Sequence, residues 1–287
     1  MRLTHLLAAL GLVAVIFASS AFGITAVNIT NRPNEHITNT TSSNWAGYVV
    51  ASTFSQTCTG NGKHKTCTGA SPVVTAAYGS WIVQTVSASS SNTYSSQWVG
   101  IGGYFDSTLI QTGTESDYVS GAASYNAWYE LLPASETPIS MTVSPGNVIN
   151  ASVVCVSSCT SSTQSWNITL DDVTTGAHFS IVTSYSSSLL SAEWIEERPA
   201  LCFAAVCSLS TLANFGTANY GTQYTSVLPT NYAVVSSVSA TPQPIGSLPY
   251  QSITMESCSG HGPNSCTTLA SPSTLSDSGT SFYVTYG

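Results

Sequence analysis

The sequence predicts an all-β fold, an antiparallel sandwich or barrel. Its apolar segments are short, rich in Val, Ile, Thr, Tyr and Trp, and separated by Gly, Pro, Asn and Ser, which is typical of strands joined by turns. No long stretch has helical periodicity, so an alternating α/β architecture is disfavoured. About 260 residues remain after an expected signal peptide, enough to bury a sizeable core.

Strands are expected wherever such a segment is bounded by turn residues. Each expected strand is short, and no internal repeat or domain linker separates them. In chain order they are 78–87, 95–105, 125–133, 148–156, 165–173, 178–186, 232–240 and 281–287.

The beginning of the chain differs in composition from the rest. Residues 1–23 have the form of a secretory signal peptide, with Arg2 before an apolar run and small residues near the cleavage site. Residues 24–43 are polar and unpatterned, which predicts a leader, short propeptide or mobile arm. Residues 44–287 are expected to form one domain. No later stretch approaches the roughly 18 apolar residues of a membrane span, so we expect a secreted monomer that does not bind membranes.

Charge is scarce and mostly negative. The chain has 13 Asp or Glu and 5 Lys or Arg, with a formal charge of -8 at pH 7, and no basic patch for phosphates. Nucleic acid is therefore not an expected partner. In acid the carboxylates are neutral and few cations remain to repel one another, which favours a protein adapted to low pH. The alternative is a secreted domain that simply uses Ser and Thr hydroxyls for solubility.

Eight cysteines occur as four close couples. An even number in an exported chain favours disulfides over zinc, and local pairing is the simplest connectivity. Zinc sites need nearby histidines, but those of the mature chain are scattered, so we expect no metal and no cofactor. The expected disulfides are Cys58–Cys67, Cys155–Cys159, Cys202–Cys207 and Cys258–Cys266.

Residues 276–281, SDSGTS, look like short signatures of serine and aspartic peptidases, but their context fits neither class. A subtilisin-like serine opens a helix, whereas a terminal strand is expected here. A bilobal aspartic peptidase needs two Asp-Thr/Ser-Gly copies, and one occurs. The segment is therefore predicted to be a turn before the last strand.

Residues 189–199, LLSAEWIEERP, concentrate three glutamates in a chain with few charges. In an extended strand side chains alternate, so Glu193 and Glu197 share one face and Glu196 lies on the other. One interpretation is a solvated strand end with Arg198 as an ion-pair partner. Because apolar residues flank the cluster, we favour carboxyl groups on an apolar sheet, where burial and neighbours tune the pKa.

Several motifs along the chain carry a wider pattern. They are SSNWAGYVV (42–50), GSWIVQ (79–84), WVGIGG (98–103), LIQTG (109–113), NAWYELLP (126–133), SAEWIEE (191–197) and the final ITMES and SGTSFYVTYG. In order and spacing they resemble the glutamic peptidases, also called eqolisins, over about residues 42–287. The resemblance implies a concanavalin-like sandwich of two antiparallel sheets and an acid-acting endopeptidase. Its catalytic Gln and Glu fall on Gln111 and Glu193.

The chemistry of that pair suits acid. A histidine base is protonated at about pH 2–4, whereas a glutamate with an ordinary pKa of about 4.3 stays partly ionised. The resemblance makes Glu193 the base that takes a proton from the attacking water and returns it to the leaving amine. Gln111 positions that water and donates to the developing oxyanion. Neither a metal nor a covalent nucleophile is required, and the expected substrates are proteins or peptides.

The resemblance also assigns supporting positions. Trp98, Trp128, Tyr129 and Glu130 match residues that line or support the family's cleft, although each aromatic is equally well explained as sandwich core. Glu115 replaces the aspartate that follows QTG in the family.

Further departures from the family pattern bear on the site. Gly102 and Asn126 stand where the family has aspartates, and the leader is shorter and less basic than family propeptides. These changes affect the hydrogen-bond network, the pH optimum and the subsites rather than the catalytic pair.

Rival functions use the same fold, because one sandwich hosts many activities. A carbohydrate-binding module would use Trp128 and Tyr129 as an aromatic platform. A glycosidase would use two carboxyls, such as Glu130 and Glu193, about 5–9.5 Å apart. A surface-coat protein would need none of these residues. The peptidase is favoured because it alone requires both Gln111 and Glu193.

Overall fold

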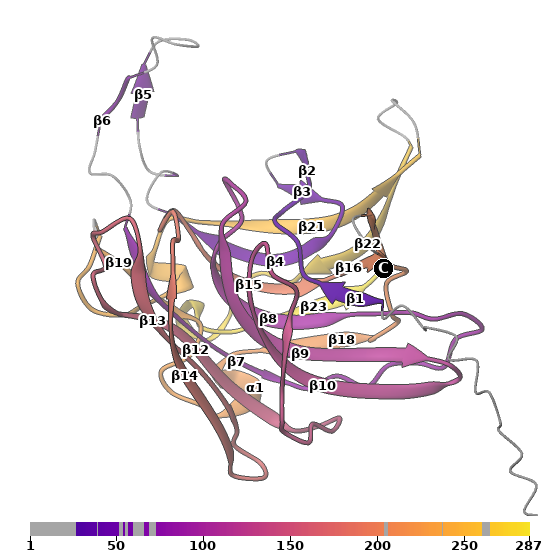
Figure 1. Ribbon diagram of the computed structural model, residues 1–287. Coiled ribbons are helices and arrows are strands. Elements are labelled where there is room, and N and C mark those ends of the chain that lie inside the picture. Colours follow the sequence, from indigo (N-terminus) through magenta and orange to yellow (C-terminus); the bar gives the residue numbers. More distant parts are fainter. Residues whose placement is uncertain are drawn as a thin grey trace, which may run out of the picture.

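The computed structural model contains two antiparallel sheets packed face to face as a sandwich (Figure 1). It describes residues 27–38, 40–51, 54, 57–59, 66–68, 73–203, 206–236, 238–259 and 265–287. Within these ranges the helices are one α-helix, α1 (Thr222–Thr225), and the short 3-10 turns η3 (Ile245–Ser247) and η4 (Asp277–Gly279). The predicted all-β sandwich is therefore confirmed.

The strands follow one another closely along the chain. They are β1 (Asn28–Thr30), β2 (His36–Thr38), β3 (Thr41–Ser42), β4 (Trp45–Val50), β5 (Thr57–Thr59), β6 (Thr66–Thr68), β7 (Val74–Ile82), β8 (Ser96–Gly102), β9 (Leu109–Val119), β10 (Ala122–Leu131), β11 (Thr137–Ile139), β12 (Val148–Ser157), β13 (Gln164–Asp172), β14 (Ala177–Tyr185), β15 (Ala192–Glu197), β16 (Ala200–Phe203), β17 (Val206–Leu209), β18 (Thr217–Tyr220), β19 (Tyr232–Val235), β20 (Gln243–Pro244), β21 (Tyr250–Cys258), β22 (Cys266–Pro272) and β23 (Phe282–Tyr286). Each strand expected from the sequence overlaps one of these strands, and η4 is the predicted turn before the last one.

Two long sheets carry most of these strands. In the first sheet the order is β11-β10-β9-β8-β15-β4-β21. In the second, β14-β13-β12-β7 continues through β18 to β23 and β22, and β19 also pairs with β7. Because β21 pairs with β4 in one sheet and with β22 in the other, it closes one edge of the sandwich.

Side-chain alternation on the first sheet separates two apolar clusters. On β8, Val99 and Ile101 point into the main core between the sheets, where they join residues such as Ile149 of the second sheet. Trp98 points the opposite way and belongs to a second buried cluster with Trp45. We call the surface of the first sheet that carries this second cluster, and that faces away from the second sheet, the site face.

The leader is ordered by contacts with the rest of the molecule, so the interpretation of residues 24–43 as a mobile arm is wrong for the part the structure describes. β1 pairs with β16, and β2 pairs with β3. Between them Asn31 is completely buried. The sequence pattern missed this because the leader is stabilised by tertiary contacts rather than by its own apolar periodicity.

Three of the four expected disulfides are confirmed: Cys155–Cys159, Cys202–Cys207 and Cys258–Cys266. The last two couples are register partners within hairpins, so they fix turns rather than join the two sheets. The side chains of Cys58 and Cys67 lie outside the described residues, but their backbones are register partners in β5 and β6.

We expect peptide mapping without reduction to find Cys58 joined to Cys67, because directly opposed residues of a hairpin bring their Cβ atoms within disulfide reach. The enclosed loop is short, so the bond should stabilise the fold by at most about 3 kcal/mol. A peptide that links either cysteine to another couple would contradict this pairing.

Among the described residues, every helix is too short to cross a membrane. The expected signal peptide, residues 1–23, lies outside the described residues.

Candidate active site

Strand register places side chains of the first sheet in rows across the site face. One row contains, in strand order, Glu130, Gln111, Gly100 and Glu193. Neighbouring strands lie about 4.8 Å apart, so the backbones of Gln111 and Glu193 are separated by two spacings, roughly 10 Å. Gly100 lies between them. The structure therefore brings the two predicted catalytic residues, which are 82 positions apart in sequence, to either side of one glycine.

The next two rows differ in character. The first is mostly apolar and the second is polar. In strand order their members are Trp128, Gly113, Trp98 and Ile195, and then Asn126, Glu115, Ser96 and Glu197. Four of the five supporting residues expected from the sequence, Trp98, Trp128, Glu115 and Glu130, thus lie on the site face.

Gly100 keeps the space between the candidate catalytic residues open. A Cβ atom at this position would lie 2.9 Å from the Gln111 Cβ and 3.0 Å from the Ile110 carbonyl oxygen. Contacts this short would force the neighbouring strand to move.

Glu130 holds the side chain of Gln111. The Gln111 Nε2 group donates to Glu130 Oε2 at 2.7 Å and makes a longer contact of 3.5 Å with the Asn31 carbonyl oxygen. Burial is the main reason why the pKa of Glu130 lies well above its usual range, and the charges of Glu197 and Glu136 act in the same direction. In acid Glu130 is therefore neutral, and it directs the NH₂ end of the Gln111 amide toward the Asn31 carbonyl.

Glu193 is completely buried in this structure. Burial is the main reason why its pKa lies well above the usual range, and the charge of Asp106 acts in the same direction. The expectation that Glu193 is partly ionised at about pH 2–4 is therefore wrong for this form of the chain. The physical reason is exclusion of water from the row in which it lies.

Glu197 binds two indoles of the site face. Its Oε2 accepts from the Nε1 groups of Trp45 and Trp98 at 3.0 Å and 2.9 Å. Its Oε1 accepts from the Asn44 side-chain amide at 3.2 Å and from the Arg32 backbone amide at 2.9 Å. Glu197 thus fixes the indole rings of Trp45 and Trp98 and also binds the leader.

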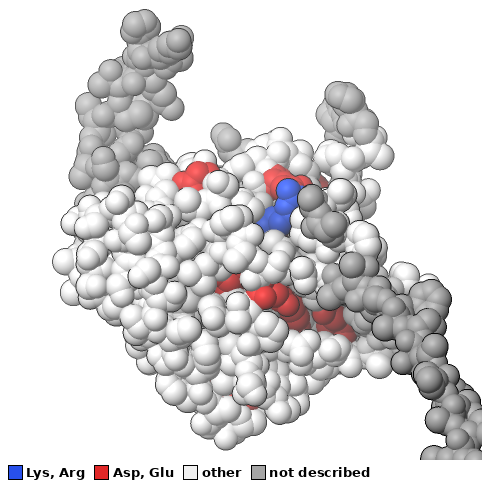
Figure 2. Space-filling model, viewed as in Figure 1, with Lys and Arg blue, Asp and Glu red and all other residues white. Residues whose placement is uncertain are grey.

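The leader crosses this site. The Asn31 backbone amide donates to Glu130 Oε2 at 3.2 Å, and the Arg32 carbonyl accepts from the Trp45 indole at 3.0 Å. In Figure 1 the indigo segment with β1 lies over the first sheet, consistent with these contacts. Figure 2 shows Asp and Glu gathered in a band across the middle of the same view, on a face with little other charge.

One expectation about a neighbouring residue needs correction. Tyr129 alternates with Trp128 along β10, so it lies on the opposite face of the sheet, where its ring stacks on Phe179. It does not line the site face. The glutamate cluster is buried, as the favoured interpretation expects, and is not a solvated strand end. Glu196 points away from the site and accepts from Gln84 Nε2 at 2.9 Å.

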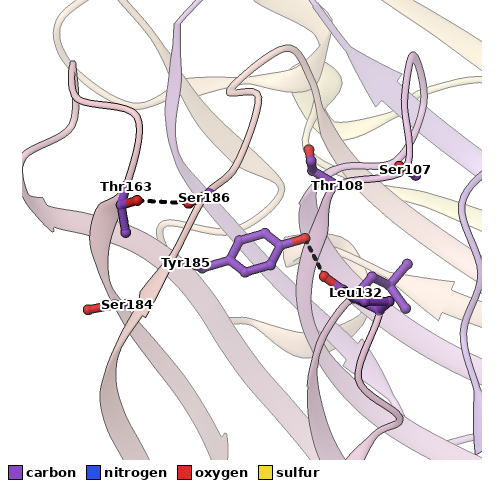
Figure 3. A pocket seen from close by; sticks show the side chains of 8 residues that line it. Ser107, Thr108, Leu132, Thr163, Ser184, Tyr185 and Ser186 are labelled. Carbon is purple, nitrogen blue, oxygen red and sulfur yellow. Dashed lines mark hydrogen bonds between the residues drawn. The ribbon is translucent and has the colours of Figure 1, made fainter.

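A separate pocket of about 490 Å³ lies at the ends of β10 and β14 (Figure 3). Hydroxyl groups line it, and Tyr185 donates from its hydroxyl to the Leu132 carbonyl at 2.9 Å. Its lining residues include no carboxyl or imidazole group, so it offers no acid or base at low pH. The lining residues are Ser107, Thr108, Leu132, Pro133, Thr163, Ser184, Tyr185 and Ser186.

Within the described ranges, one group of potential metal ligands is closely spaced: Glu256, Cys258 and Cys266. The two cysteines form a disulfide, which removes the thiolates that a metal would bind.

The buried carboxyl groups predict a fold that is more stable in acid than at neutral pH. Burial raises the pKa of Asp117 to about 7 and that of Glu136 to about 8, against ordinary values near 4. The folded chain therefore retains protons that the unfolded chain loses, so this stabilisation is complete below about pH 4 and is lost as the pH rises through about 7 to 8. We expect calorimetry to show the thermal midpoint falling by about 10 °C or more from pH 4 to pH 8.

An Asp117→Asn variant is the matched control for this pH dependence. It keeps the neutral shape but cannot titrate, so its midpoint should vary less with pH. A midpoint that rises toward pH 8 in the unchanged chain would contradict the assignment.

Comparisons with known proteins agree with this architecture. Residues 43–233 match the sequence model of the Peptidase A4 family. Aspergillopepsin-2 from Aspergillus niger is 32% identical over 133 residues, 44% of this chain and 43% of that protein, so the chain matches less than half of that relative's length.

Two solved structures share the fold. A scytalido-glutamic peptidase with a peptide based transition state analog has a TM-score of 0.60 and 23% identity, over 85% of this chain and 98% of that one. SCP-B, a member of the eqolisin family solved with the tripeptide Ala-Ile-His, has a TM-score of 0.55 at the same identity and coverage.

Proposed function

This chain belongs to the Peptidase A4 family, and on that premise we propose that it is a secreted, acid-acting endopeptidase that uses Gln111 and Glu193 to hydrolyse peptide bonds. The observation that supports it best is the row on the site face in which these two residues flank Gly100. A carboxyl and an amide on either side of one position are the groups that a base and an oxyanion donor require, whereas a glycosidase requires two carboxyl groups.

The reaction begins when the Glu193 carboxylate takes a proton from water. The water oxygen adds to the carbonyl carbon of the substrate, and the Gln111 amide donates to the oxyanion that forms. The neutral Glu193 then returns the proton to the amide nitrogen as the carbon–nitrogen bond breaks. Glu130 holds the Gln111 amide in the donating orientation. Glu197 fixes the indole ring of Trp98 beside the row.

The leader must leave the site before a substrate can enter. Its departure admits water to the row, which lowers the pKa of Glu193 toward its ordinary range and allows the carboxylate to form in acid. The raised pKa of Glu193 therefore belongs to the site covered by the leader, and Glu193 acts as a base at low pH only after the leader has left.

A carbohydrate-binding function has less support. Trp128 and Tyr129 lie on opposite faces of β10 and do not form one aromatic platform. The backbones of Glu130 and Glu193 are three strand spacings apart, roughly 14 Å, with Gln111 between them, which disfavours a glycosidase pair.

We expect the secreted chain to digest an acid-denatured protein with a maximum near about pH 2–4 and to lose that activity by about pH 7, because the buried carboxyl groups of Asp117 and Glu136, which are neutral in the acid fold, ionise near that pH. Polysaccharides incubated in parallel should remain intact. Digestion is measured by peptide release and mass spectrometry. A neutral optimum, or cleavage of the polysaccharide alone, would contradict the proposed function.

A further inference from the structure

The leader shows how an extended peptide binds to the site face. Polar side chains of the site bind its backbone groups: Glu130 accepts from the Asn31 amide, Glu197 from the Arg32 amide, and Trp45 donates to the Arg32 carbonyl. Every peptide carries these backbone groups, so such contacts are independent of the side chains. We therefore use the path of the leader as the path of a substrate. The residues that contact its side chains then correspond to the substrate-binding subsites.

The contacts also give the direction of the bound peptide. The Asn31 carbonyl oxygen faces the Gln111 Nε2 group at 3.5 Å, where a scissile carbonyl is expected if Gln111 donates to the oxyanion. The next nitrogen, that of Arg32, donates to Glu197 Oε1 at 2.9 Å. In the leader this nitrogen is bound by Glu197, so a substrate that is cut must present it to Glu193 instead. The carbonyl contact with Gln111 makes Asn31 the counterpart of the substrate residue on the acyl side of the bond that is cut.

The side chain of this residue is buried against Glu115. Asn31 is completely buried, and its Nδ2 group donates to Glu115 Oε1 at 3.4 Å. Gly113 separates Gln111 from Glu115 on the same face of β9, and the side chains of Trp98 and Trp128 pack closely over it. The Asn31 Oδ1 atom is also buried, and it has no hydrogen-bond donor among the residues that the structure describes.

On the basis of the proposed function, we propose that Glu115 is a specificity-determining residue, whose carboxyl group selects a primary amide, above all asparagine, on the acyl side of the cleaved bond. A neutral carboxylic acid has one acceptor and one donor, which is the complement of a side-chain amide with its NH₂ and C=O. In that form the second Glu115 oxygen donates to Asn31 Oδ1 while the first accepts from Nδ2. Both buried polar groups of the asparagine are then paired.

The surroundings of Glu115 keep it in this neutral form. Burial raises its pKa well above the usual range, and the nearby carboxyls of Asp117 and Glu136 act in the same direction, against the hydrogen bond from Asn31. A leucine in the same place has a similar size but leaves the buried carboxyl without a partner. Sites built to bind a polar group reject an apolar analogue for this reason.

Competition between peptides tests the subsite. The nonapeptide VNITNRPNE, which copies residues 27–35, is mixed in equal amounts with a version in which leucine replaces the asparagine at position 31. The chain is first shown to digest an acid-denatured protein, and the mixture is then added at the same pH. Mass spectrometry measures cleavage between positions 31 and 32, which gives the ratio of the two kcat/KM values. We expect the asparagine peptide to be preferred by at least about 10-fold.

Two substitutions at one position separate the chemistry from the fold. Glu115→Leu should abolish or reverse the preference, whereas Glu115→Gln, which can still pair with an amide, should keep it within about threefold. The ratio is measured within each variant, so a smaller yield of folded protein does not alter it. Glu196→Gln, on the opposite face of the sheet, is the control and should leave the ratio unchanged.

The outcomes also separate this proposal from the proposed function. Digestion of the denatured protein with no preference between the peptides, or a preference that Glu115→Leu leaves intact, would overturn the subsite while the peptidase activity stands. If neither the denatured protein nor either peptide is cut in acid, the proposed function is wrong and the subsite falls with it.

Discussion

Replacing Glu193 by Gln is expected to lower peptide hydrolysis at low pH by at least about 100-fold. The substitution keeps the size of the side chain and its hydrogen-bonding atoms, but the amide cannot take a proton from water. Because the carboxyl is already neutral in the covered site, the fold should not change, and the thermal midpoint in acid should stay within a few degrees of that of the unchanged chain. Peptide release and calorimetry on the same sample measure both effects.

Glu196→Gln is the matched control for this experiment. Glu196 lies three residues along β15, is equally buried, and binds Gln84 on the opposite face of the sheet. Its substitution should leave the rate within a few-fold. If both variants lost activity to the same extent, the cluster would have a shared structural role, and near-full activity of Glu193→Gln would remove Glu193 from the mechanism.

The second large effect is expected from Gln111→Ala. Removing one oxyanion donor costs about 100- to 1000-fold in kcat in known cases, and here it also removes an anchor for the attacking water. The loss should appear in kcat more than in KM, since the interaction strengthens only when the oxyanion forms. Steady-state kinetics with one peptide substrate in acid separate the two parameters.

Gln84→Ala provides the comparison for Gln111→Ala. Gln84 is also a buried amide bound to a glutamate of this cluster, with Nε2 donating to Glu196 at 2.9 Å, but it lies on the core side. Its loss should lower the thermal midpoint and leave kcat nearly unchanged. A Gln111→Ala variant that keeps near-full kcat would contradict the oxyanion role whatever its effect on stability.

Local patterns predicted much of the fold. The strand segments, the turn at 276–281 and the cysteine couples are encoded by neighbouring residues, and the alternation along β15 follows from extended geometry alone. Glu193 and Glu197 therefore share a face in the structure as expected. The order of the leader could not be predicted, because the residues that bind it, such as Glu130 and Trp45, lie on distant strands.

The candidate site could be predicted only in part. The family resemblance points to Gln111 and Glu193 but not to Gly100, although a glycine in a strand often marks a close approach. The resemblance also includes Tyr129, which strand alternation places on the other face. The two-residue period along residues 126–133 is the sequence signal that separates Tyr129 from Trp128.

By itself, the sequence determined the all-β class, the alternation of each strand, the local cysteine couples and the scarcity of charge, because these depend on composition or on residues a few positions apart. Tertiary structure decided which strands became neighbours. It alone set the row from Glu130 to Glu193, the burial of the three glutamates with their raised pKa values, and the position of Asn31 beside Glu115. The physical reason is that cross-strand register and exclusion of water depend on chain segments far apart in sequence.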